Sequence, residues 1–150
     1  MPGYRVHLLG GIGATAVGIG VAIYKGGIAF SVPQIVSLLA IGSLASLFPD
    51  VDTDSKGQNI FYFLLASLDI ALMIKRYYKW AAILGFMAML PALGRHRGWT
   101  HTLWAMVLVP SPLLVLPLLF YKISLSTMLP YYLAAVIGYF SHLLLDRKFL

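Results

Sequence analysis

The chain of 150 residues is 60% hydrophobic and only 11% charged, with 11 basic and 5 acidic residues and a formal net charge of +6. A soluble domain usually carries about 25% charged residues, so the composition excludes an ordinary water-soluble domain and indicates one integral membrane domain, residues 1–150. The basic residues stand singly or in short clusters between apolar blocks, as membrane-flanking charges do, which argues against nucleic-acid binding. The absence of cysteine excludes disulfides and thiolate metal ligands.

The apolar residues form six blocks, at positions 8–24, 33–49, 60–74, 80–94, 101–121 and 128–146. A membrane-spanning helix needs about 20 residues, so the first two and the last two blocks are long enough to span a bilayer. We expect the first block to be a span rather than a cleaved signal, and the two short middle blocks to form a helical hairpin over 60–94. The sequence therefore predicts an all-α, multi-pass transmembrane helical bundle of about six spans.

Local features refine this bundle. The turn Lys75–Lys79 between the two middle blocks is basic and aromatic, which suits the level of the lipid headgroups. Prolines predict a kink or break in the fifth block, and they are Pro110, Pro112 and Pro117. Glycines in the first block would let neighbouring helices approach closely, and they are Gly10, Gly11, Gly13, Gly18 and Gly20.

Histidines and carboxylates gather at one end of the predicted bundle. With six spans, the N-terminus, the segments 50–59 and 95–99 and the C-terminus emerge on the same membrane face. All 4 histidines and every carboxylate except Asp69 fall at these places, whereas the opposite face receives basic residues with no acid and no histidine. We call the first of these the site face.

Imidazoles and carboxylates together suit zinc, manganese or iron(II), whereas calcium and magnesium favour oxygen ligands. The candidate metal ligands are His7, Asp50, Asp52, His96, His101, His142 and Asp146. His142 and Asp146 are four residues apart, so a helix places them on one face. This set exceeds the four ligands of a structural zinc, so we expect a divalent metal, zinc first, as one or two ions. The alternatives are a hydrogen-bonded His–Asp pair and a solvated acidic loop; the common face favours the metal.

Two of the charged residues are candidates for catalysis. Asp52 could serve as a base as well as a ligand, and Arg97 could neutralise the charge of a substrate or contact lipid phosphates. Asp69 lies inside the third block, about 9 Å along a helix from Lys75, and we expect a structural pairing for it because charges in a membrane are usually paired. No GxSxG motif indicates a serine hydrolase.

Four segments carry a family resemblance, namely His7–Gly10, Pro49–Asp52, His96–Thr102 and Gly138–Asp146. In this order they resemble the YdjM-like family of bacterial and archaeal membrane-bound, metal-dependent hydrolases, whose name also refers to LexA regulation. The resemblance implies a multi-pass protein of the cytoplasmic (inner) membrane of a prokaryote, a divalent metal and a hydrolase. Two positions differ from the family pattern, since Thr53 stands where a histidine often follows the second aspartate and Thr102 replaces a usual serine.

These observations favour a hydrolase that acts on a lipid-linked or membrane-proximal ester, first of all a phosphoester, through a metal-activated water. Its expected partner is a membrane lipid or lipid-linked substrate. The alternative is a divalent-metal transporter or a metal-stabilised membrane scaffold without catalysis. A transporter places polar residues near the middle of the membrane, where this sequence offers little beyond Asp69.

The orientation in the membrane is nearly balanced. The site face carries Arg5, Lys56, Arg95, Arg97, Arg147 and Lys148, and the opposite face carries Lys25, Lys75, Arg76, Lys79 and Lys122. The positive-inside rule counts these residues. When Arg95 and Arg97 are assigned to the site or its substrate, the count favours the opposite face as cytoplasmic, so we expect the site face to lie outside.

Overall fold

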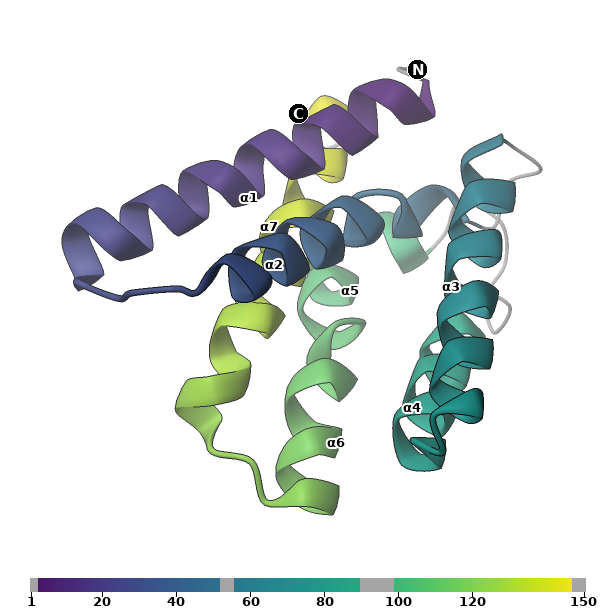
Figure 1. Ribbon diagram of the computed structural model, residues 1–150. Coiled ribbons are helices and arrows are strands. Elements are labelled where there is room, and N and C mark those ends of the chain that lie inside the picture. Colours follow the sequence, from purple (N-terminus) through teal and green to yellow (C-terminus); the bar gives the residue numbers. More distant parts are fainter. Residues whose placement is uncertain (1–2, 52–55, 90–98, 147–150) are drawn as a thin grey trace.

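The computed structural model describes residues 3–51, 56–89 and 99–146, and within these ranges it contains helices and no strand. In chain order the α-helices and short 3₁₀ helices (η) are α1 Tyr4–Gly26, α2 Val32–Ala45, η1 Phe48–Asp50, α3 Lys56–Ile74, α4 Tyr78–Met89, η3 Trp99–His101, α5 Leu103–Leu108, α6 Ser111–Tyr121 and α7 Leu125–Leu145. The predicted all-α bundle is confirmed (Figure 1).

Five helical segments of the described chain are long and apolar enough to cross a membrane, namely Tyr4–Gly26, Val32–Asp50, Lys56–Ile74, Leu103–Tyr121 and Leu125–Leu145. The third differs from the prediction, because α3 begins at Lys56 and its 19 residues make it a full-length span rather than a short one. Helix α4 is described over 12 residues, and the expected remainder, 90–94, lies outside the described ranges. The multi-pass architecture is therefore confirmed.

Helices α3 and α4 form the predicted hairpin and lie side by side (Figure 1). The turn between them is closed by backbone hydrogen bonds, since the amide of Tyr77 donates to the carbonyl of Leu72 at 2.8 Å. Arg76 takes a left-handed conformation with φ 61°, which lets the chain reverse. This turn lies at the end of the hairpin away from the two chain termini.

Helices α1, α2 and α7 pack closely through glycines. A Cβ atom on Gly138 of α7 would overlap the backbone of Gly42 in α2, and one on Gly11 of α1 would lie 2.5 Å from the Ser46 hydroxyl. The predicted close approach of α1 is thus confirmed at Gly11. At Gly13 and Gly20 an added Cβ would meet nothing within 4 Å, so the prediction is wrong for these two, which lie on a face of α1 that no other described helix covers.

The predicted break in the fifth block is confirmed. It falls between α5 and α6, where Pro110 caps the second helix and Pro112 occupies its first turn. Proline has no amide hydrogen to donate, so the helix restarts at this point. Pro117 is accommodated inside α6.

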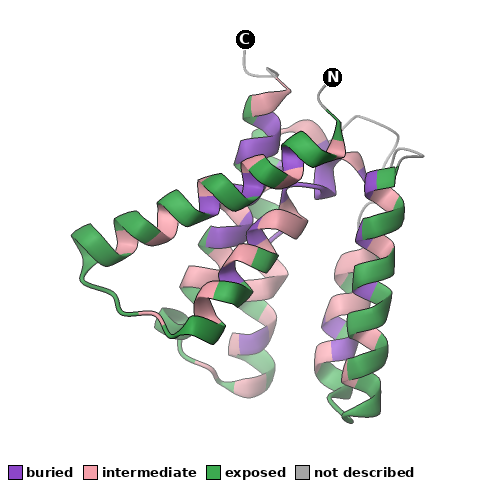
Figure 2. Cartoon of the chain, turned by 45° about the horizontal axis from the view of Figure 1, so that its top comes forward, coloured by how far each residue is buried: buried purple, intermediate pink, exposed green. Residues whose placement is uncertain are grey.

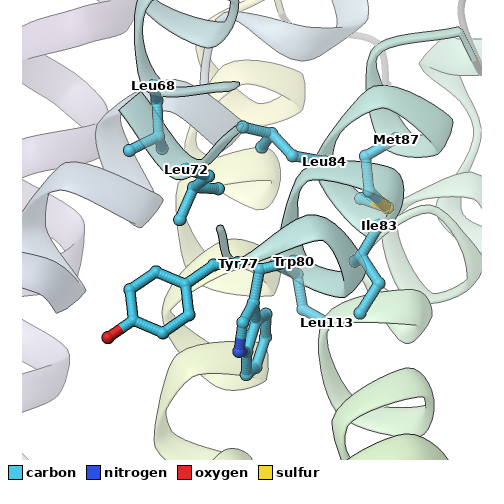
Figure 3. Close-up of a pocket in the computed structure, with 8 residues that line it drawn as sticks. All are labelled: Leu68, Leu72, Tyr77, Trp80, Ile83, Leu84, Met87 and Leu113. Carbon is cyan, nitrogen blue, oxygen red and sulfur yellow. The ribbon is translucent and has the colours of Figure 1, made fainter. Parts of the chain in front are cut away.

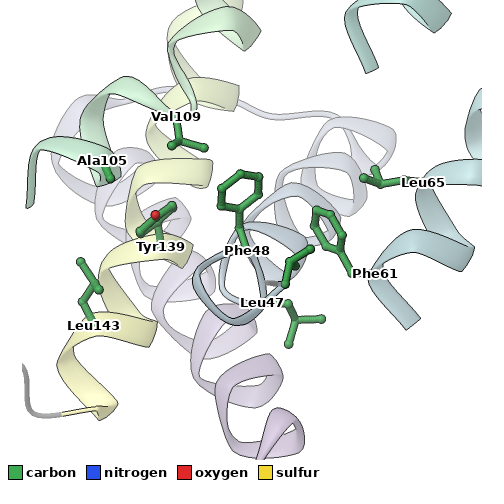
Figure 4. Close-up of a cluster of buried hydrophobic side chains, with 9 residues drawn as sticks. Leu47, Phe48, Phe61, Leu65, Ala105, Val109, Tyr139 and Leu143 are labelled. Atoms are coloured by element: carbon green, nitrogen blue, oxygen red, sulfur yellow. The ribbon is translucent and has the colours of Figure 1, made fainter. Parts of the chain in front are cut away.

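Buried residues concentrate at the end of the bundle that holds both termini, while most of α1 is exposed (Figure 2). A hydrophobic cluster fills this end and includes Phe48 of η1 (Figure 4). Its buried members are Leu47, Phe48, Val51, Phe61, Leu65, Ala105, Val109, Tyr139 and Leu143. Apolar side chains such as Val17 and Leu119 remain exposed, as expected for helices that face lipid. Most of the buried apolar side chains therefore lie at this end of the bundle.

Candidate metal centre

Four elements converge at the site face and contribute five polar groups. Helix α1 supplies His7, η1 supplies Asp50, η3 supplies His101, and α7 supplies His142 and the C-cap residue Asp146. Ligand atoms of Asp50, His101, His142 and Asp146 all lie within 4.8 Å of one another. The fold thus brings together residues that are far apart in the chain.

The spacing within the cluster is wider than that of charge-assisted hydrogen bonds. The Nε2 atom of His101 lies 3.4 Å from Asp50 Oδ1 and 3.7 Å from Asp146 Oδ2. The Nε2 atom of His142 lies 3.5 Å from Asp146 Oδ2 and 3.7 Å from Asp50 Oδ1. Charge-assisted hydrogen bonds are shorter, about 2.7–2.9 Å. Two ligands at about 2.0–2.2 Å from a tetrahedral zinc lie about 3.3–3.6 Å apart, and the observed separations are close to this range, at 3.4 and 3.5 Å within it and at 3.7 Å just above it.

A backbone hydrogen bond fixes the ring of His142. Its Nδ1 atom lies 2.7 Å from the carbonyl oxygen of Ser46 at the end of α2. Because a carbonyl only accepts, Nδ1 carries the proton and Nε2 keeps its lone pair directed at the two aspartates. Nε2 of His142 is buried and has no hydrogen-bond partner in the described chain, as expected of a nitrogen kept for a metal.

His101 is oriented in a similar way through a threonine. The hydroxyl of Thr100 donates to the carbonyl of Pro49 at 3.2 Å and lies 3.2 Å from Nδ1 of His101. Because the hydroxyl proton is directed at Pro49, Nδ1 of His101 is the donor in the second contact, and Nε2 again keeps its lone pair. The Tyr139 hydroxyl donates to the carbonyl of Thr100 at 2.5 Å, which ties η3 to α7.

His7 extends the cluster on the other side of Asp146. Its ring stacks on that of His142 with centroids 4.0 Å apart, and its Nε2 lies 3.4 Å from Asp146 Oδ1. Asp146 thus directs one oxygen towards His7 and the other towards His101 and His142. A carboxylate in this position can bridge two cations.

The burial of these groups favours a bound cation. The side chains of His7 and Asp146 are each 1% exposed, and both nitrogens of His7 and both oxygens of Asp146 lack hydrogen-bond partners in the described chain. A buried carboxylate without partners is costly, and a divalent ion would offset that cost. Asp50 is 33% exposed, so its carboxylate forms the side of the cluster that is open to solvent. The donor set therefore fits a divalent metal.

The predicted site residues fall into two groups. His7, Asp50, His101, His142 and Asp146 come together as described above. Asp52, His96 and Arg97 lie outside the described residues, so their roles stay predictions. The expected pairing of Asp69 is not seen, since its Oδ1 is buried without a hydrogen-bond partner and no ion pair to it occurs within the described ranges.

Sequence reasoning missed the residues that orient the ligands. Thr100 and Tyr139 lie inside the segments His96–Thr102 and Gly138–Asp146, which carry the family resemblance. Membership in these segments could therefore have marked both residues as candidates. Ser46 acts through its backbone carbonyl, which no residue type reveals. Thr102 has a structural part, because its hydroxyl accepts from the amide of Ala105 and caps α5.

The fold and this cluster define the class of protein. It is a multi-pass helical membrane protein with a cluster of histidines and aspartates at one membrane face. The family model of the YdjM inner membrane protein matches residues 1–147. The chain therefore belongs to the YdjM inner membrane protein family, which confirms the predicted resemblance and the inner-membrane location. Searches of curated proteins and of solved structures found no match. The family description gives a location and no reaction.

Proposed function

We propose that the protein is a metal-dependent hydrolase that cleaves a lipid-linked or membrane-proximal ester, first of all a phosphoester. The observation that carries the proposal is the cluster of His101, His142, Asp50 and Asp146, open to solvent only at Asp50, whose nitrogen–oxygen separations of 3.4–3.7 Å suit ligands of one cation better than hydrogen bonds. Mixed nitrogen and oxygen donors favour zinc, with manganese and iron(II) as alternatives.

Each residue has a distinct part in this proposal. His101 and His142 would hold the cation through Nε2, whose lone pairs are kept free by the contacts of Nδ1, and Asp146 would hold it through Oδ2. Asp50, the most exposed of the four, lies where substrate and water would arrive and can accept a proton. A divalent ion bound by these residues would supply an ionised water near neutral pH and would stabilise developing negative charge. We assign Asp52 as a second base or ligand and Arg97 as the residue that neutralises the substrate's charge.

The two sides of Asp146 support the expectation of one or two ions. Oδ2 faces His101 and His142, and Oδ1 faces His7. The cluster of four would hold the first ion. A second ion, if one is bound, would be held by His7 and Asp146 Oδ1, with His96 as a further candidate ligand. In two-metal hydrolases such a pair stabilises the attacking and the leaving oxygens together.

The position of the centre supports a lipid-linked substrate. The ligands lie at the ends of apolar helices α1 and α7 and beside η1, which ends the second span. A headgroup can reach this level while its hydrocarbon tail stays in the bilayer. A phosphoester fits best because its negative charge complements a divalent ion.

The test combines metal analysis with hydrolysis by the full-length protein in nanodiscs. We expect about one to two equivalents of zinc per chain and zinc-dependent release of product from lipid phosphoesters in a panel that also includes carboxyl-ester lipids. His142→Asn should lose both metal and activity, whereas Ser126→Ala, on the exposed far end of α7, should keep both. Metal-loaded protein that hydrolyses no member of the panel would contradict the proposal.

A second assay tests the two alternative functions, a divalent-metal transporter and a metal-stabilised scaffold. Uptake of radiolabelled zinc into proteoliposomes, abolished by His142→Asn, would favour the transporter. Metal binding that raises the melting temperature without hydrolysis or uptake would favour the scaffold. The hydrolase proposal predicts no uptake above empty liposomes.

A further inference from the structure

A basic turn lies between α3 and α4, at the opposite end of the molecule from the candidate metal centre. Lys75, Arg76 and Lys79 are exposed there, and the sequence contains no acidic residue between Asp69 and Asp146. The turn therefore carries a local positive charge that no neighbouring carboxylate along the chain offsets. Positive charge at headgroup level attracts anionic lipid.

Aromatic contacts fix this basic turn against α6. The ring of Trp80 stacks on that of Tyr121 with centroids 4.8 Å apart and an interplanar angle of 13°. The ammonium of Lys79 lies 5.6 Å from the centroid of the same tyrosine ring. These contacts hold the lysine at the place where α4 meets α6, and the amphipathic rings suit the membrane interface.

Two apolar cavities flank α4 next to the turn. One, of about 390 Å³, runs from Tyr77 and Trp80 near the turn to Leu68 and Met87 (Figure 3). The other, of about 370 Å³, is lined by Lys79 at one end and by Ala82, Phe86, Leu116 and Phe120 beyond it. The side chain of Ile83 lines both cavities and separates them. The helix thus stands between two grooves that start at the same basic turn.

We propose that this end of the protein binds one anionic diacyl phospholipid. Its phosphate lies against Lys75, Arg76 and Lys79, and its two acyl chains occupy the grooves on either side of Ile83. Charge complementarity selects an anionic headgroup over a zwitterionic one, and the paired grooves select a lipid with two chains. Basic pockets between membrane helices bind such headgroups in general. The inference does not depend on the proposed hydrolase.

Variants that block a groove distinguish the binding of one lipid from a general attraction of lipid to a charged surface. Ala82 is exposed and lines one groove, so Ala82→Phe fills that groove without changing any charge. Ala16 on α1 is likewise exposed and lines neither groove, so Ala16→Phe adds the same bulk at a control position. For the charges, Lys75→Gln/Arg76→Gln/Lys79→Gln is compared with Lys25→Gln, which removes an exposed basic residue elsewhere on the same face.

The measurement is native mass spectrometry of the full-length protein after exchange into detergent with phosphatidylglycerol or phosphatidylcholine of identical chains. We expect retention of phosphatidylglycerol to exceed that of phosphatidylcholine by about tenfold. The triple variant and Ala82→Phe should each lose most of this retention while eluting as monodisperse protein, and both controls should keep it. Equal retention of the two lipids, or wild-type retention by Ala82→Phe, would overturn the proposal.

Discussion

The Nδ1 atom of His142 lies 2.7 Å from the backbone carbonyl oxygen of Ser46, so the end of α2 determines which nitrogen of a histidine in α7 faces the candidate metal. The same serine lies against α1, because a Cβ on Gly11 would lie 2.5 Å from its hydroxyl oxygen and 2.6 Å from its Cβ. Ser46 therefore takes part both in the packing of α1, α2 and α7 and in the orientation of the candidate ligand His142.

The first prediction uses this coupling. Gly11→Ala should displace Ser46 and thereby misdirect the ring of His142, which weakens zinc binding by about tenfold, the lower end of the effects seen for groups that orient ligands. Gly13→Ala, two residues along the same helix, adds a methyl group that meets nothing within 4 Å and should bind zinc like the wild type. Competition titration with a fluorescent zinc chelator measures both variants. Identical affinities for the two would refute the coupling.

The second prediction concerns Asp146. Its place at a helix end predicts a side chain near water, but that side chain is 1% exposed. Replacement by alanine would therefore leave a cavity and lower stability as well as remove a ligand. Asp146→Asn keeps the volume and removes the charge. We expect zinc affinity to fall by about a hundredfold or more, with unchanged elution on size exclusion. Full zinc content in a well-folded Asn variant would remove Asp146 from the ligand set.

The arrangement of the helices is predictable from the sequence because it depends on composition and on the alternation of loops between the two membrane faces. Long apolar blocks indicate membrane spans. Since every second loop returns to the same face, the order of the blocks alone sorts His7, Asp50, His101 and Asp146 together. The break at Pro110 follows from the missing amide hydrogen of proline. These features depend only on residue type and position in the chain.

Other features depend on the three-dimensional packing and could not be predicted in this way. Whether Gly11 or Gly13 faces a neighbour is decided by the rotation of α1, and both residues look alike in the sequence. The carbonyl of Ser46 acts on His142 through a backbone atom that every residue possesses. The expected structural pairing of Asp69 is also not seen within the described ranges, because the distance along one helix does not show what the side chain meets.

The third prediction tests the hydroxyl that orients His101. Thr100→Val removes the link between Nδ1 of His101 and the carbonyl of Pro49 while keeping the shape of the side chain. Zinc affinity should fall by about 10–100-fold, as it does when outer groups of a metal site are removed. The matched control is Thr15→Val, since the buried hydroxyl of Thr15 has no hydrogen-bond partner in the described chain. Its loss should leave zinc binding unchanged and stability equal or slightly higher.

The fourth prediction addresses the two sides of Asp146. If His7 and Oδ1 hold a second ion, His7→Asn should lower the zinc content from about two equivalents to about one, measured by plasma mass spectrometry on dialysed protein. His101→Asn should instead remove the ion of the four-residue cluster. A wild-type protein that binds a single ion, still bound by His7→Asn, would assign His7 to packing against His142 rather than to a metal.

The last prediction concerns the side of the membrane that the metal centre faces. Gly3 lies at the site face beside the start of α1, is exposed, and an added Cβ there meets nothing within 4 Å. Ser124 caps α7 at the opposite end and is also exposed. Because the chain has no cysteine, Gly3→Cys and Ser124→Cys each introduce a single thiol. The tight basic turn at Lys75–Lys79 favours the cytoplasm for the opposite end, so a membrane-impermeant maleimide on intact cells should label Gly3→Cys and spare Ser124→Cys, with both labelled after permeabilisation. The reverse pattern would place the metal centre in the cytoplasm and limit its substrates to lipids of the inner leaflet.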